Sequence, residues 1–119
     1  MAEKAIRDLI ANPALGALFV VEMSDRIEAY LVVTFGYSLE FGGRDAFVDE
    51  LYVAPSARKK GLGTAALDVA EQACRAAGIR ALHLEVERIN LRAKSLYDRR
   101  GFYEHSRHLM TKLLDANRK

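Results

Sequence analysis

The segment Arg58-Lys59-Lys60-Gly61-Leu62-Gly63 combines three consecutive cations with two glycines and has the composition of an anion-binding loop. It lies between a predicted strand and a predicted helix, so unpaired N–H groups and the positive end of the helix dipole converge there. It matches neither the phosphate loop of nucleoside triphosphatases nor the three-glycine dinucleotide fingerprint. We therefore expect it to bind another phosphate-bearing small molecule. A tight turn with solvated lysines is the plain alternative.

The predicted elements around this loop alternate between strand and helix patterns. A short helix carries Ala5, Leu9 and Ile10 and ends before Asn12-Pro13. Strands rich in Val, Leu, Phe and Tyr and two further amphipathic helices follow. The strands are predicted over Leu15–Glu22, Ile27–Tyr37, Ala46–Val53, Ala81–Glu87, Phe102–Glu104 and His108–Leu114, and the helices over the residues after Gly63 up to Gly78 and over Leu91–Arg100. This order predicts a mixed α/β fold with one parallel crossover at its centre.

The overall composition excludes several classes of protein. The chain has 119 residues and a net charge of +2 from 18 basic and 16 acidic residues, which is too balanced for a nucleic-acid-binding surface. Its longest apolar stretches, such as Leu15–Val21, are too short to span a membrane, and its first residues do not resemble a signal peptide. Cys74 is the only cysteine, and the three histidines lack ligand spacing, so we expect no disulfide and no metal site. We expect a soluble, cytoplasmic protein.

Four short motifs occur in a fixed order along the chain. They are the strand Val48–Val53, then Arg58-x-x-Gly61-x-Gly63, then Leu82–Val86, and finally Asn90-x-x-Ala93-x-x-x-Tyr97-x-x-x-Gly101-Phe102. In this order and spacing the chain resembles, from about Leu15 to Leu114, the GNAT superfamily of acyl-CoA-dependent N-acetyltransferases. The resemblance implies a GNAT-like fold with splayed central parallel strands, in a single domain over residues 1–119 that is short at its N-terminus.

The resemblance also implies acetyl-CoA as the acyl donor. Its pyrophosphate would bind the loop and the start of the following helix, at Arg58, Lys59, Lys60, Gly61, Leu62, Gly63 and Thr64. Its pantetheine arm would lie between the strands Ala46–Val53 and Ala81–Glu87 and pair with the backbone of Leu51, Tyr52 and Val53. Further contacts to the cofactor would come from Asn90, Ala93 and Tyr97. Asn90 is equally suited to cap the helix that follows it.

Acetyl transfer to an amine needs a proton donor for the departing thiolate, a donor for the oxyanion and a base for the amine. By resemblance, Tyr97 is the general acid and the backbone N–H of Val53 is the oxyanion donor. The candidates for the base are Glu85 and Asp49, with Glu50 held in reserve. Strand alternation places Asp49 on the same face as Leu51 and Val53. The alternatives are a core tyrosine and carboxylates that are surface charges.

The chain departs from the superfamily in having one short helix before its first predicted strand, where an additional strand and helix are usual. A sheet edge left uncovered in this way favours a homodimer, by edge pairing or by exchange of His108–Leu114, unless the natural chain begins upstream of Met1. The leading prediction is acetylation of a primary amine on a small molecule. The alternatives are acetylation of a protein N-terminus or lysine, and a catalytically weak acetyl-CoA-binding module that regulates a partner.

Overall fold

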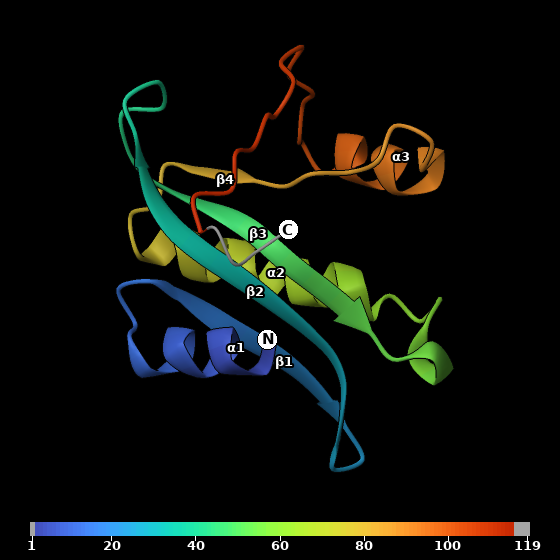
Figure 1. The fold of residues 1–119 in the computed structure, drawn as a ribbon. Helices are drawn as coiled ribbons and strands as arrows, with labels where there is room; N and C mark the ends of the chain where they lie inside the picture. Colours follow the sequence, from blue (N-terminus) through green and yellow to red (C-terminus); the bar gives the residue numbers. More distant parts are fainter. Residues whose placement is uncertain (1, 116–119) are drawn as a thin grey trace. The chain divides into compact units, whose positions relative to one another are not determined.

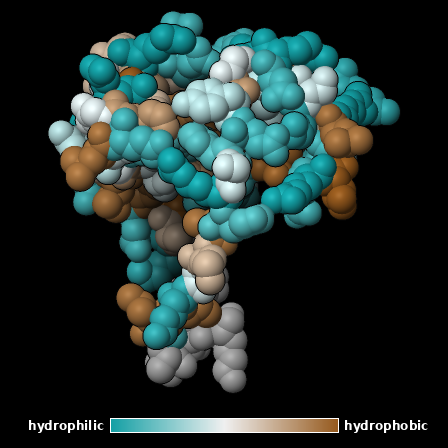
Figure 2. Space-filling view, turned by 90° about the horizontal axis from the view of Figure 1, so that it is seen from above, coloured by the Kyte–Doolittle hydropathy of each residue, from teal (hydrophilic) through white to brown (hydrophobic). Residues whose placement is uncertain are grey.

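A computed structural model describes residues 2–115, and the chain divides into two compact units, Met1–Glu85 and Val86–Lys119. In the first unit the elements are α1 (Ala2–Ala11), β1 (Gly16–Met23), β2 (Arg26–Ser38), β3 (Gly43–Val53), the 3-10 turn η1 (Pro55–Ala57), α2 (Leu62–Ala76) and β4 (Ala81–His83). In the second unit the regular element among the described residues is α3 (Leu91–Arg99). Figure 1 shows the elements and Figure 2 a mostly hydrophilic face of the molecule.

The sheet of the first unit has the order β1-β2-β3-β4, antiparallel between β1, β2 and β3 and parallel between β3 and β4. The predicted hairpin and the parallel crossover are therefore confirmed. The β1–β2 turn is made by Ser24 and Asp25, both at positive φ, which asparagine and aspartate tolerate better than most residues.

The core lies between α2 and one face of the sheet. Leu31 and Val33 are fully buried on β2, and their partners Leu51 and Val48 on β3 share their face. α2 turns Ala66, Leu67, Ala70 and Cys74 inward, as its amphipathic pattern predicts. We call this side of the sheet the α2 face.

The opposite side of the sheet carries Tyr30, Val32 and Thr34 of β2, and we call it the α1 face. Gly16 of β1 is paired with Thr34, and a Cβ added to Gly16 would lie 3.1 Å from Cδ1 of Leu9 in α1. α1 therefore packs over the β1 end of this face, while α2 covers the other side of the sheet (Figure 1).

Strand β3 contains one residue more than its partner. Val32 is paired with Glu50 and Val33 with Val48, so Asp49 has no partner across the strands and forms a β-bulge. The bulge interrupts strict alternation, and the prediction that Asp49 shares a face with Leu51 and Val53 is wrong. Val48, not Asp49, lies with these two residues on the α2 face.

Three of the predicted strands differ from the structure. β4 is paired only from Ala81 to His83, so Leu84–Glu87 is not a strand. The bulge lies two residues beyond Phe47, the last β3 residue paired with β4. A bulge of this kind bends its strand, which is compatible with the end of the parallel pairing at this point. Phe102–Glu104 and His108–Leu114 are irregular in the described chain. Alternating apolar and polar residues give a segment two different faces, but a strand also needs a neighbouring strand to form hydrogen bonds with.

β1 lies at one edge of the sheet, as expected for a chain without an additional strand beside it. The homodimer inferred from that edge stays a prediction. No helix in the part of the chain that the structure describes is long and apolar enough to cross a membrane.

Replacing Leu67 by alanine tests the core. The Leu67 side chain is 1% exposed on α2, so Leu67→Ala leaves a cavity and should lower the free energy of unfolding by about 3 kcal/mol. Leu15→Ala is the matched control because Leu15 is 49% exposed, and it should cost well under 1 kcal/mol, about the range of surface changes. Denaturant unfolding measures both, and equal losses would contradict this assignment of the core.

Candidate functional site

The loop between β3 and α2 is held by short-range backbone bonds. Ala57 N–H donates to Ala54 C=O over 2.9 Å and closes η1, which begins at Pro55. The chain then passes through Lys59 and Gly61, with φ of +69° and +76°, before α2 begins. A Cβ on Gly61 would meet no atom within 4 Å, so this glycine is needed for its φ and not for space.

The first turn of α2 leaves its donors free. The N-cap residue Gly61 supplies no side-chain cap, and the first intrahelical bond runs from Ala65 N–H to Gly61 C=O at 3.0 Å. Among the described residues, no acceptor lies within hydrogen-bond reach of the N–H groups of Leu62, Gly63 and Thr64. These three donors and the helix dipole have the chemistry expected of an anion site, and the site itself stays a prediction.

Gly63 has a different role from the one its position in the loop indicates. A Cβ on Gly63 would lie 3.5 Å from Cγ2 of Val53 and 3.9 Å from Cδ2 of Leu51. Gly63 therefore faces β3, and its lack of a side chain lets the first turn of α2 lie close to this strand.

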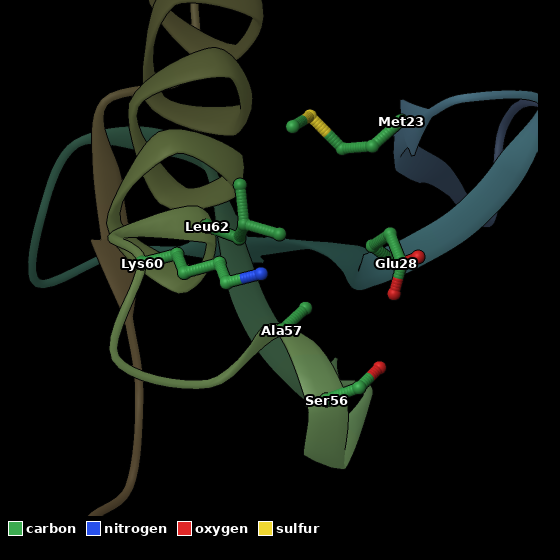
Figure 3. Close-up of a pocket in the computed structure, with 6 residues that line it drawn as sticks. All are labelled: Met23, Glu28, Ser56, Ala57, Lys60 and Leu62. Atoms are coloured by element: carbon green, nitrogen blue, oxygen red, sulfur yellow. The ribbon is translucent and has the colours of Figure 1, made fainter.

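The three loop cations point to different places. Arg58 Nε donates to the C=O of Val53 over 3.1 Å, which ties the loop to the end of β3. Lys60 extends over a pocket of about 150 Å³ beneath the start of α2 (Figure 3). Lys59 is exposed at its left-handed position.

This pocket contains a carboxylate that the sequence did not reveal as special. Glu28 is skipped in the β1–β2 register, where Ala29 is paired with Val21 and Ile27 with Glu22. Its side chain is 14% exposed, and its Oε2 is buried without a hydrogen-bond partner. It lines the pocket with Met23, Ser56, Ala57, Lys60 and Leu62 (Figure 3). A second bulge thus places Glu28 beside the cationic loop.

Beyond Phe47 and His83 the parallel pair of strands separates. Among the residues that the structure describes, no strand is paired with Val48–Val53 on the side away from β2. Ala54 N–H donates to Glu28 C=O over 2.8 Å, toward β2, so alternation turns the backbone groups of Val53 and Leu51 to the open side. Of the three residues predicted to pair with pantetheine, Leu51 and Val53 therefore present free N–H groups at the open edge. The N–H of Tyr52 faces β2, so the structure does not place Tyr52 at this edge.

The three carboxylates considered as the base lie in different surroundings. Asp49 is exposed at the bulge, and Glu85 is exposed beyond the end of β4. Glu50 lies on the α1 face, where it accepts a hydrogen bond of 2.7 Å from Tyr30 Oη. The ring of Tyr30 stacks on that of Tyr52 at 5.4 Å. The bond to Glu50 is the main cause that raises the pKa of Tyr30 above its usual value.

The remaining predicted residues lie in the second unit. Oδ1 of Asn90 accepts a hydrogen bond of 3.1 Å from Ala93 N–H, so the capping role of Asn90 is confirmed. Tyr97 is half-buried on α3, with its ring edge-on to Phe102 at 5.8 Å. Burial raises the pKa of Tyr97, so its phenol stays protonated at neutral pH.

Comparison with known proteins agrees with this geometry. The model of the acetyltransferase (GNAT) family matches residues 2–102, and the chain belongs to this family, whose members generally use acetyl-CoA. A search of curated proteins finds no match.

Solved structures share the fold over most of the chain. Integron cassette protein HFX_CASS3, from the mobile metagenome of Cole Harbour Salt Marsh, is 38% identical with a TM-score of 0.83, over 96% of this chain and 70% of that one. An aminoglycoside 6'-N-acetyltransferase from Acinetobacter haemolyticus is 17% identical with a TM-score of 0.75, over 96% and 81%. A ribosomal-protein-alanine N-acetyltransferase from Brucella melitensis is also 17% identical with a TM-score of 0.75, over 95% and 81%.

Gly61→Ala tests the loop, with Gly78→Ala as its matched control. The two glycines have φ of +76° and +78°, and an added Cβ meets no atom within 4 Å at either. Each alanine therefore costs about 1 kcal/mol in strain. Only Gly61→Ala should reorient the free donors of α2 and weaken acetyl-CoA binding about fivefold or more, as measured by calorimetry. Equal affinities for acetyl-CoA in the two variants would contradict the assignment of the anion site to this loop.

Proposed function

We propose that this protein transfers the acetyl group of acetyl-CoA directly to a primary amine of a small cationic molecule. The observation that carries the proposal is the open edge of β3. The free N–H groups of Leu51 and Val53 lie beside the uncapped first turn of α2, since Gly63 in that turn approaches both residues closely. The first turn of α2 suits an anion, and the open edge of β3 suits an extended chain that contains amides.

The residues of the chain fit acetyl-CoA at three points. The N–H groups of Leu62, Gly63 and Thr64 would hold the pyrophosphate, and the backbone of Leu51 at the open edge would pair with a pantetheine amide. Bound acetyl-CoA supplies an acyl carbon that is already activated as a thioester. The N–H of Val53 would donate to the carbonyl oxygen of the thioester as negative charge develops there.

The acceptor would approach from the α1 face. α2 covers the other face, and in the first unit α1 packs over the β1 end only. The stacked rings of Tyr30 and Tyr52 and the carboxylate of Glu50 lie on this face beside the bulge. Aromatic faces and a carboxylate attract a cation, which favours a positively charged amine over a neutral or anionic acceptor.

An acceptor screen that follows release of free thiol from acetyl-CoA tests the function. We expect turnover with polyamines and aminoglycoside-like amines that exceeds turnover with alanine-ended and lysine-containing peptides. Turnover with peptides alone would instead support the protein acetyltransferase. Binding of acetyl-CoA without thiol release for any amine would support the regulatory module and contradict the proposal.

Glu50→Gln tests recognition of the acceptor. Removing the charge should raise KM for the best amine about tenfold, as expected when a hydrogen bond to a charged group is lost, with acetyl-CoA affinity unchanged. Glu22→Gln is the control, because Glu22 is an exposed carboxylate on β1 of the same sheet. If both variants keep the KM of the unmodified protein, Glu50 does not bind the acceptor.

Tyr97→Phe tests the general acid. Its phenol is protonated at neutral pH, and removing the hydroxyl should lower kcat about 100-fold, with the affinity for acetyl-CoA nearly unchanged. Tyr103→Phe, at a residue 70% exposed, is the control and should keep full activity. A kcat for Tyr97→Phe within a factor of two of the unmodified protein would return Tyr97 to a packing role.

A further inference from the structure

His83 occupies the point where the parallel strands part. It is the last β4 residue in the ladder and is paired with Phe47 of β3. Phe47 is paired with Thr34, and Asp45 with Gly36, so this end of β3 presents Phe47 and Asp45 to the α1 face. His83 therefore lies where the β3–β4 pairing ends and the open edge of β3 begins. It is on the α1 face, from which the acceptor would come.

The imidazole of His83 is held by a carboxylate. Its Nε2 lies 3.1 Å from Oδ2 of Asp45, and the two side chains are 22% and 20% exposed. The rings of Phe41 and Phe47 flank the imidazole, with centroids at 5.1 and 5.9 Å. Asp45 is a titratable group in direct contact with His83.

The pairing fixes which nitrogen is basic. An ionised carboxylate can only accept a hydrogen bond, so the Nε2 of His83 carries the hydrogen that it donates to Asp45. The lone pair is then left on Nδ1. A carboxylate that holds one nitrogen also stabilises the imidazolium formed when the other takes a proton.

We propose that Nδ1 of His83, oriented by Asp45, is the proton acceptor for the amine substrate. This inference rests on the proposed function. An ammonium acceptor gives one proton to Nδ1 and becomes a neutral amine, whose nitrogen forms a bond to the thioester carbon. The carbon–sulfur bond breaks, the thiolate leaves with the electron pair, and the second proton lost from nitrogen passes to the sulfur. His83 then returns its proton to water.

His83 suits this step better than the carboxylates predicted from the sequence. Glu85 and Asp49 are exposed, and no second group of the described chain orients either of them by a hydrogen bond. Glu50 already accepts a bond from Tyr30.

His83→Gln tests the proposal, because glutamine can still donate to Asp45 but cannot take a proton. At neutral pH, kcat/KM for the amine should fall about 100-fold, with acetyl-CoA affinity unchanged. The loss should shrink above the pKa of the substrate amine, where the amine is neutral without a base. A purely structural role for His83 would give a loss independent of pH, and that result would overturn the proposal.

Two further variants complete the test. Asp45→Asn keeps the imidazole but removes its orienting carboxylate, so it should lower kcat/KM by a smaller factor than His83→Gln. His105→Gln replaces an exposed histidine of the second unit and should leave the rate unchanged. An Asp45→Asn protein with the full rate would overturn the orienting role of Asp45.

A nitrogen NMR spectrum of the histidines separates failure of this inference from failure of the proposed function. His83 should carry its hydrogen on Nε2 and shift when a polyamine is added, whether or not turnover follows. Thiol release by the unmodified protein together with a hydrogen on Nδ1 of His83 would overturn only the inference. If no amine gives thiol release, the proposed function fails, and an unshifted His83 signal then rejects the inference as well.

Discussion

Strand β3 has one residue more than β2 can pair, and the geometry of the site depends on where that residue falls. Asp49 is left out of the register two residues after the last bond between β3 and β4. A bulge bends its strand and increases the local twist, which is compatible with the parallel pairing ending at Phe47 and His83. The backbone of Val48–Val53 thereby loses a partner on one side.

Unpaired backbone groups at a sheet edge are costly when buried and are a template for another extended chain when open. Here the edge ends beside the first turn of α2, whose own donors are uncapped. Gly61 allows the loop to turn into the helix, and Gly63 allows the helix to start close to Leu51 and Val53. The two sets of free donors are therefore adjacent, which suits a ligand with an anionic head and an amide-containing arm. Membership in the acetyltransferase (GNAT) family agrees with this chemistry.

The sequence predicted those elements that depend on residues close together along the chain, such as turns and helix caps. The helix that follows the cationic loop, the hairpin of β1 and β2 and the cap at Asn90 were predicted and are confirmed. The predicted start of the helix after Gly63 is wrong, because α2 begins at Leu62 and Gly63 lies in its first turn. The extent of β4 was not predictable, because the alternation of Leu82, Leu84 and Val86 identifies a face but not a partner.

The bulges and the pair of Asp45 and His83 could not be predicted either, because each depends on two segments that are distant in the sequence. The bulges at Asp49 and Glu28 arise from the register between two strands, and neither strand shows it alone. The pair of Asp45 and His83 joins residues 38 positions apart, so only the parallel crossover reveals it. His83 taken by itself had the pattern of an ordinary polar residue on a strand.

The central claim is that the open edge of β3 binds acetyl-CoA, and site-resolved amide hydrogen exchange tests it most directly. With saturating acetyl-CoA, exchange at Leu51 and Val53 should slow markedly. Exchange at Tyr52, whose amide faces β2 by alternation, should change little and serves as the internal reference. Unchanged exchange at Leu51 and Val53 while acetyl-CoA protects other segments would contradict the account.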